Sequence, residues 1–380
     1  MCNKYIIFKY LTEAFIVLQF IVLIIAGCKQ NNKDLAKHNL VFKKENAINL
    51  YDANFYNNKI IIPLEIKEYK SKEYSLVHGR SSVKKDKENL FIYTSDIPYP
   101  IFRFDMEGNY INKIGDVGIG PNEFKNVKDM IINEKNDVIE ILSNNRIYRF
   151  FYDGTPDYNR EIGISTTSFT LVNGSYWLYI GNINTYSEYR LFQTDQNFNI
   201  EKSYLSDKSK MFHFTEYNFK QNPYNTFRES LYYNMYSIQG DSLTMLHTIQ
   251  FPGMEFPSNM HKIDPEKAAE SLSVSHFAVI MCYLENKNFI YIFASENDIN
   301  SKPILYHWII NKNNNQEKII KIDLNKFNKW IESSYLTNPQ LLTDDDFLYF
   351  LGYVTENDND DFDNDYDLNP SIVIVNCNEL

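Results

Sequence analysis

Short runs of apolar and aromatic residues recur along the chain, and their pattern predicts β-strands. In each run Leu, Ile, Val, Phe, Tyr and Trp predominate, and polar or turn-forming residues separate one run from the next. Branched and aromatic side chains suit a half-buried pleated surface, and runs this short are typical of strands rather than helices. Six runs stand out, at residues 90–93, 138–142, 176–180, 243–246, 289–293 and 347–351.

The spacing of these runs predicts a ring of small sheets. Their first residues are 48, 38, 67, 46 and 58 positions apart, which scatters around the ~40–50 residues of a four-stranded propeller blade. One such sheet cannot bury both of its faces, whereas a closed ring of sheets buries the faces and hides the edges. We therefore predict an all-β fold, a six-bladed β-propeller, and the alternative is a pair of β-sandwiches.

Turn residues support the division into blades. Gly108 and Gly154 each follow an acidic residue between two strand-like segments, as in a hairpin, and residues 195–197 and 313–315 stand in the corresponding place later in the chain. The first and last blades of a propeller usually interlock, so we expect residues 59–66 to lie beside residues 371–375. Short helices are predicted at residues 264–270 and 325–331.

The first thirty residues have the pattern of an export signal. Two lysines precede the apolar stretch of residues 14–26, and the stretch ends with Ile25-Ala26-Gly27-Cys28. These four residues resemble the bacterial lipobox, which implies a lipid on the Cys28 thiol. The alternative, an uncleaved membrane anchor, needs a longer apolar run of about 20 residues. We expect a lipoprotein signal peptide at residues 1–27, a polar tether at 28–45 and the propeller at 46–380.

Charge and cysteine content narrow the range of partners. The formal net charge is −11, which argues against nucleic acid as the main partner because phosphate binding needs clustered Lys and Arg. Cys2 would leave with the signal peptide and Cys28 would carry lipid, so Cys282 and Cys377 remain in the folded protein. We expect these two to be buried thiols, and a single disulfide bridge is the alternative.

A Gly-rich stretch, residues 115–124, is the most distinctive motif in the chain. Its glycines, proline and final acidic-aromatic pair resemble a junction in six-bladed β-propeller lipoproteins of Bacteroides-type bacteria, which are similar in shape to NHL-repeat propellers. The matching positions are Gly118, Gly120, Pro121, Glu123 and Phe124. Asn122 replaces a usual Gly but also accepts a left-handed turn. The resemblance implies the fold and a location in the envelope, and it carries no catalytic signature.

The same stretch has a second interpretation as a phosphate-binding loop. It lacks the Lys-Ser/Thr ending of a P-loop, and the residues that follow do not suggest a helix whose amino end faces a phosphate. We therefore expect an inter-blade turn that Glu123 and Phe124 hold in place.

Two further segments are candidates for ligand binding. An aromatic-rich segment that is not cleanly strand-like could form an exposed platform for sugar rings, and its residues are Tyr224, Phe227, Arg228, Tyr232, Tyr233 and Tyr236. An acidic segment could hold Ca²⁺ at Asp358, Asp360, Asp361, Asp363 and Asp365, but its spacing fails the EF-hand pattern, so we expect a solvated loop. No histidine pair has zinc-site spacing and no G-x-S-x-G elbow is present, so no catalytic or metal-binding residue is assigned.

These observations favour a binding protein over an enzyme. We expect a non-catalytic binding or scaffold module, anchored to the outer membrane, whose ligand is a glycan, a peptide or another envelope protein. The alternative is a carbohydrate- or lactone-directed hydrolase or lyase with acids converging at the channel mouth, and a third interpretation is an assembly factor with a large apolar patch. The mostly uncharged residues after Cys28 favour the periplasmic face over the cell surface.

Overall fold

The computed structural model divides the chain into Met1–His38 and Asn39–Leu380, and the fold belongs to the second unit. The expected signal peptide, Cys28 and the acidic segment lie outside the described residues, and none of the helices within those residues could span a membrane. The structure describes residues 38–53, 58–65, 81–95, 98–181, 187–206, 219–220, 224–229, 231–262, 266–267, 270–271, 275–297, 302–324, 339–354 and 369–379.

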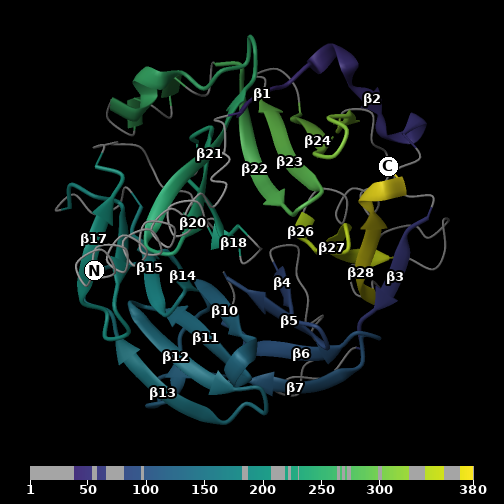
Figure 1. The fold of residues 1–380 in the computed structure, drawn as a ribbon. Coiled ribbons are helices and arrows are strands. Elements are labelled where there is room, and N and C mark those ends of the chain that lie inside the picture. The colour runs from purple at the N-terminus through teal and green to yellow at the C-terminus, as the bar shows by residue number, and fades with distance from the viewer. Residues whose placement is uncertain are drawn as a thin grey trace, which may run out of the picture. The chain divides into compact units, whose positions relative to one another are not determined.

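The described part of the second unit forms six sheets of four or five strands arranged in a ring (Figure 1). Within each sheet the strands run from the centre of the ring to its rim mostly in chain order, and consecutive strands are antiparallel, whereas the strand Ile48–Asn49 pairs in parallel with its neighbour at the rim. Apolar clusters fill the spaces between sheets, as where Phe91, Phe124 and Ile141 meet between the first two. The all-β class and the six-bladed propeller are thus confirmed.

Blades 1 to 3 have four strands each, and the innermost strand comes first. Blade 1 consists of β4 (Ser81–Lys85), β5 (Asn89–Thr94), β6 (Ile101–Asp105) and β7 (Tyr110–Ile114). Blade 2 consists of β10 (Asp129–Asn133), β11 (Val138–Ser143), β12 (Arg146–Phe151) and β13 (Pro156–Glu161). Blade 3 consists of β14 (Ser168–Val172), β15 (Ser175–Tyr179), β16 (Leu191–Thr194) and β17 (Ile200–Tyr204).

Blades 4 to 6 each take their outermost strand from the start of the chain. Blade 4 consists of β18 (Phe219–Lys220), β19 (Thr226–Arg228), β20 (Asn234–Gln239), β21 (Ser242–Gln250) and β1 (His38–Val41). Blade 5 consists of β22 (Phe277–Glu285), β23 (Phe289–Asn297), β24 (Ile304–Asn311), β25 (Glu317–Asp323) and β2 (Ile48–Asn49). Blade 6 consists of β26 (Pro339–Leu342), β27 (Phe347–Val354), β28 (Asn369–Asn376) and β3 (Ile60–Pro63).

The remaining elements are short. The strands β8 (Asp116–Val117) and β9 (Glu123–Phe124) pair with each other in the Gly-rich stretch. The 3-10 helices are η1 (Lys44–Asn46), η2 (Leu50–Asp52), η3 (Glu134–Asn136), η4 (Ser258–Lys262) and η5 (Cys377–Glu379). Glu266, Lys267, Glu270 and Ser271, the described part of the first predicted helix and the residue after it, are helical, and residues 325–331 lie outside the described residues.

The N-terminal segment closes the ring as the sequence predicts. In β3, Ile60 pairs with Ile374 and Ile62 pairs with Ile372, so β3 lies beside β28 as expected for residues 59–66 and 371–375. The same segment also crosses the rims of blades 4 and 5, because β1 and β2 pair there and the Phe42 ring lies 5.4 Å from that of Trp308. The end of the segment expected to be a tether, from residue 38 on, therefore takes part in the fold.

Five of the six apolar runs lie in the second strand of their blade, and the run at 243–246 lies in β21, the fourth strand of blade 4. In the turn of blade 3 the positive φ falls on Phe198, at 65°, and not on residues 195–197. The Asp195 carboxylate accepts the amides of Asn197 and Asn199 at 2.8 and 2.9 Å, which fixes the turn around Phe198.

Candidate functional site

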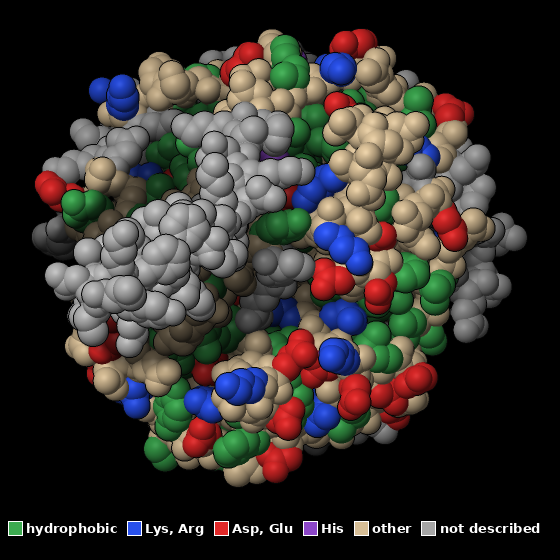
Figure 2. Space-filling model, in the orientation of Figure 1, with side chains coloured by type: hydrophobic (Ala, Val, Ile, Leu, Met, Phe, Trp, Pro, Cys, Tyr) green, Lys and Arg blue, Asp and Glu red, His purple; other side chains and the backbone are tan. Residues whose placement is uncertain are grey.

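A cavity of about 490 Å³ lies where the innermost strands end. Side chains from five blades line it, among them Lys84 of β4, Ile132 of β10, Lys220 of β18, Glu285 of β22 and Gln340 of β26. The lining continues into residues directly after β4, β10 and β26, so the cavity opens on the face where these strands finish. Figure 2 shows this face hollowed near the middle of the ring.

The edges of the innermost strands are covered by side chains from the preceding blade. An uncovered edge would expose unpaired backbone groups to the channel. The Val83 amide of blade 1 donates to Gln340 Oε1 of blade 6 at 3.3 Å. Lys84 of blade 1 donates to the Met130 carbonyl of blade 2, and Asp129 of blade 2 accepts the Phe169 amide of blade 3 at 3.1 Å. The polar residues of the channel thus have a structural role before any ligand is considered.

The ammonium group of Lys84 sits between blades and beside another lysine. Its Nζ lies 3.4 Å from Asp129 Oδ1, and the side chain is 18% exposed. Burial lowers the pKa of Lys84, the nearby charge of Lys220 lowers it further, and Asp129 opposes both. Lys220 reaches across from blade 4 to within 3.4 Å of the Gln340 carbonyl of blade 6. Two cationic side chains from well-separated blades therefore share the inner part of the cavity.

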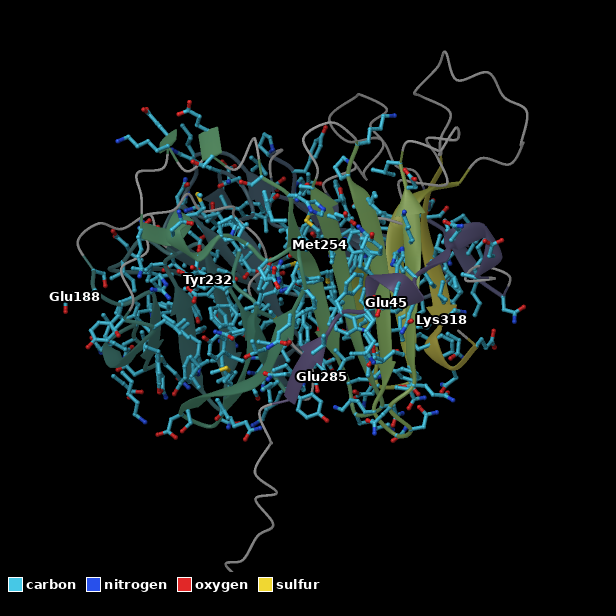
Figure 3. The ribbon with its side chains drawn as sticks, turned by 90° about the horizontal axis from the view of Figure 1, so that it is seen from above. Glu45, Glu188, Tyr232, Met254, Glu285 and Lys318 are labelled. Atoms are coloured by element: carbon cyan, nitrogen blue, oxygen red, sulfur yellow. The ribbon has the colours of Figure 1, made fainter. Side chains whose placement is uncertain are left out.

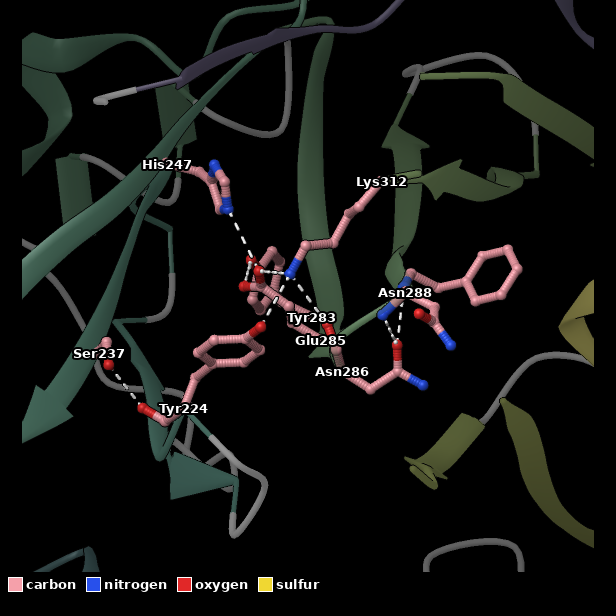
Figure 4. Close-up of polar contacts among 9 residues, drawn as sticks. Tyr224, Ser237, His247, Tyr283, Glu285, Asn286, Asn288 and Lys312 are labelled. Carbon is pink, nitrogen blue, oxygen red and sulfur yellow. Dashed lines mark hydrogen bonds and ion pairs between the residues drawn. The ribbon is translucent and has the colours of Figure 1, made fainter. Parts of the chain in front are cut away.

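Glu285 brings a buried carboxylate to the same cavity and belongs to a network between blades 4 and 5 (Figure 4). Its Oε1 lies 2.9 Å from Lys312 Nζ and 3.6 Å from His247 Nε2, and its Oε2 accepts the Tyr283 hydroxyl. Burial by itself would raise the pKa of Glu285, but His247 and Lys312 outweigh it, so that pKa is lowered. In the edge-on view of Figure 3, Glu285 lies near one face of the ring and Met254, beside the start of β22, lies deeper.

This arrangement is suited to holding a polar ligand. The cavity size falls within the ~300–1,000 Å³ of small-molecule sites, and its walls carry both charges and apolar groups. The buried glutamate in it, Glu285, is neutralised by Lys312. Within the described residues, no three His, Cys, Asp or Glu side chains come together as a metal-binding group would require.

The six residues of the expected aromatic platform are not gathered on one exposed surface. Phe227 is buried in the core between blades 3 and 4, 5.2 Å from the Tyr179 ring. Arg228 is also buried and donates to the carbonyls of Ile280 and Met281 at 2.9 and 2.7 Å. These two residues lie on β19, so the segment contains a strand of blade 4 where the sequence did not indicate one.

The four tyrosines of that set are half-buried and are held by different neighbours. Tyr233 donates to the Ala278 carbonyl at 2.7 Å, and burial raises its pKa to about 12. Tyr232 lies under the Arg190 guanidinium, 5.6 Å from the ring centre. Tyr236 packs on the core ring of Phe227.

Only Tyr224 of the set belongs to the network beside the cavity. Lys312 Nζ lies 4.5 Å from the centre of the Tyr224 ring and donates to the Tyr224 hydroxyl at 3.2 Å (Figure 4). The backbone carbonyl of Tyr224 accepts the Ser237 hydroxyl at 2.6 Å.

The Gly-rich stretch forms a compact loop between blades 1 and 2. Glu123 Oε2 accepts the Gly120 amide at 2.8 Å, and a Cβ at Gly118 would lie 1.9 Å from the same oxygen. Phe124 is fully buried, and the Pro121 carbonyl accepts the Asn159 side chain of β13 at 2.7 Å. Ile119 at the tip is 96% exposed. These contacts explain why small residues stand beside Glu123.

Sequence reasoning missed Lys84, Lys220 and Glu285. They lie 136 and 65 positions apart and share no motif, so only the ring brings them to one cavity. The feature they share is that each is a charged residue at or near the end of the first strand of its blade. Cys282 and Cys377 are both buried and unbridged, as expected, and they lie in the core between blades 5 and 6.

Comparisons with known proteins place the chain among propellers. A family model described as a domain of unknown function, DUF4934, matches residues 28–375. A crystal structure of a Bacteroides fragilis protein thought to be exported is similar over 89% of this chain and 99% of its own, with a TM-score of 0.68 and 15% identity. That similarity supports the fold alone.

Two other solved structures are less similar. The WD40 domain of Neurospora crassa Pan2 has a TM-score of 0.44 and 11% identity over 84% of this chain and 96% of its own. A Bacteroides caccae protein of unknown function has a TM-score of 0.36 and 12% identity over 63% of this chain and 85% of its own. No curated protein matches the chain.

Proposed function

The chain belongs to the DUF4934 family of domains of unknown function, and we propose that it is a non-catalytic binding module that takes its ligand at the mouth of the central channel. The observation that carries this proposal is the cavity of about 490 Å³ that five blades line where their first strands end. A rigid ring of sheets suits binding because the lining side chains are held by contacts between blades and need little ordering when a ligand enters.

The proposal includes an address in the cell envelope. The lipobox-like sequence ending at Cys28 supports a signal peptide at residues 1–27, a lipid on Cys28 and attachment to the outer membrane, on its periplasmic face. The family match also begins at residue 28. Labelled palmitate should enter the wild-type protein and not Cys28→Ser, and equal labelling of both would contradict the lipidation.

The binding function is testable with the full chain in detergent. A thermal-shift screen would use glycans, peptides, simple sugars and sugar acids, and a ligand at a hundred times its dissociation constant should add ~2.7 kcal/mol to the unfolding free energy. Asp345 is exposed among the lining residues, so Asp345→Trp should obstruct the mouth and abolish the shift. Glu201→Trp, on the outer strand β17, is the matched control. A ligand that shifts both variants and wild type equally binds elsewhere, which would contradict the proposal.

A carbohydrate- or lactone-directed hydrolase or lyase is the second candidate. The observation that favours it is that two groups with shifted pKa values, Lys84 and Glu285, line the same cavity. Chromatography of each ligand after incubation separates the two functions, because an enzyme returns cleaved ligand and a binding module returns it intact.

A further inference from the structure

The direction of β1 shows on which side of the ring the N-terminal segment enters. β1 pairs with β21 at the rim of blade 4. The Phe42 amide, directly after β1, donates at 2.9 Å to the carbonyl of Gln250, the last residue of β21. The two strands therefore end at the same place and run in parallel, as β2 does with β25 in blade 5.

β1 begins on the side of the ring where the cavity opens. The innermost strand of blade 4, β18, ends at this face, and consecutive strands of the blade are antiparallel, so the fourth strand, β21, runs away from it. Because β1 is parallel to β21, it also runs away from the mouth of the channel. In Figure 3 the purple strand β1 begins at the edge of the ring where Glu285 lies.

The chain between Cys28 and this strand is short. His38 follows Cys28 by ten residues, which span at most about 36 Å when fully extended and about 17 Å on average as a flexible chain. The innermost strand β22 has nine residues and is itself ~30 Å long. A lipid on Cys28 would therefore hold the mouth side close to the membrane, whereas the far face could approach it only if the same segment first ran back along the depth of the ring.

The charges at the mouth are compatible with such a placement. The residues that line the cavity include four lysines and five acidic residues, so this lining is nearly neutral, whereas the whole chain has a net charge of −11. An acidic protein surface and the phosphates of anionic lipids repel each other. That repulsion is weaker at the mouth than the net charge of the chain suggests.

We propose that the mouth face of the ring is turned to the membrane, so that the cavity takes polar groups displayed at the membrane surface. The inference rests on the proposed function, because it requires the lipid on Cys28 and a ligand site at the mouth, and it deepens that function by naming the side from which the ligand comes. A group within reach of the tether can then enter the cavity while the ring stays anchored.

The test is energy transfer from a dye on the ring to labelled lipids. The full lipidated chain would be added to vesicles of phosphatidylethanolamine and phosphatidylglycerol that contain an acceptor-labelled lipid. Cys282 and Cys377 are buried, so a maleimide donor should react with a cysteine introduced at the surface.

Two exposed positions distinguish the faces. Asp345→Cys places the donor among the residues that line the mouth. Glu255→Cys places it on the far face, because the carbonyl of the adjacent Met254 accepts the Ala278 amide, at the start of β22, at 2.8 Å. We expect transfer to be severalfold more efficient from the mouth, since the faces are ~30 Å apart.

Two further variants test the tether as the cause. Cys28→Ser with the donor at position 345 is the control and should show no transfer. A linker of about twenty Gly and Ser residues inserted after Asn32 raises the average reach to about 30 Å and should narrow the difference between the faces.

The possible failures are distinguishable. Equal transfer from both faces, more transfer from the far face, or transfer that persists in Cys28→Ser overturns the inference. A difference that the long linker leaves unchanged also overturns it, because the tether would then not set the orientation. The ligand screen and Asp345→Trp are measured in detergent, so they decide the proposed binding at the mouth separately. If palmitate does not enter the wild type, the envelope address and this inference fail together, and the screen still decides the binding.

Discussion

The interface between blades 2 and 3 and the interface between blades 4 and 5 each bury a glutamate, but they treat its charge in opposite ways. Glu140 is 1% exposed and accepts the Tyr176 hydroxyl at 2.6 Å, with Arg149 only at 4.0 Å. Burial dominates there and raises its pKa. Glu285 is 3% exposed, but the Lys312 ammonium lies at 2.9 Å, and its pKa is lowered. Equal burial therefore does not fix the charge of a carboxyl group, because a cation within hydrogen-bond distance reverses the effect of desolvation.

The largest expected effect comes from removing the charge of Glu285. Glu285→Gln leaves the Lys312 ammonium, 26% exposed, without its counter-charge and should lower the unfolding free energy by about 3 kcal/mol. The double variant Glu285→Gln with Lys312→Met should recover most of that loss, because the uncompensated cation is gone. Urea unfolding of the full chain measures both, and a double variant less stable than the single one would contradict the pairing.

Replacing the two tyrosines that donate to these glutamates should have smaller and unequal effects on the unfolding free energy. Tyr176→Phe removes the shortest hydrogen bond of Glu140 and should cost about 2 kcal/mol, whereas Tyr283→Phe leaves Glu285 with Lys312 and should cost about 1 kcal/mol. The order of the two costs, measured in the same urea series, is the informative quantity. Equal or reversed costs would show that the cation does not dominate at Glu285.

The smallest expected effect at neutral pH is that of Glu140→Gln, which keeps an acceptor for Tyr176 and should change stability by about 1 kcal/mol or less. The matched Glu285→Gln shows whether a neutral substitute is equally tolerated where a cation is close.

The pH dependence of the same two variants should have opposite signs. Because the folded pKa of Glu140 is raised above 4.5, its stabilising contribution is present below that pH and is lost as pH rises through the folded value. The folded pKa of Glu285 is lowered, so its contribution is present above 4.5 and is lost as pH falls. The difference in unfolding free energy between wild type and each variant, followed across acidic pH, checks this. Parallel curves would contradict the comparison.

Local patterns predicted the blades well where each strand carries its own signal. The runs that begin at residues 90, 138, 176, 289 and 347 are all second strands, and the isoleucines of β3 close the ring beside β28. The prediction was wrong where a neighbour decides the conformation. Phe198 takes the positive φ of its turn, whereas the turn was expected at residues 195–197, and its ring lies 4.8 Å from that of Tyr176, so packing holds it there.

The aromatic platform was expected from composition, and composition does not indicate burial. The aromatic segment around residues 224–236 is dense in rings because it contributes to the walls between blades, as the burial of Phe227 shows. Composition alone does not distinguish a ring that packs from a ring that is exposed.

What the sequence by itself determined is the strands that carry apolar runs, the positions of the hairpin turns and the closure. The strands and turns depend on residues close together in the chain, and the closure depends on the pairing of two apolar segments. The meeting of Lys84, Lys220 and Glu285 in one cavity was decided only by the tertiary structure. Each of them lies on the first strand of a different blade, and the closed ring brings those strands together around one cavity. The charge state of Glu285 was decided in the same way, because Lys312 and His247 approach it from two different blades.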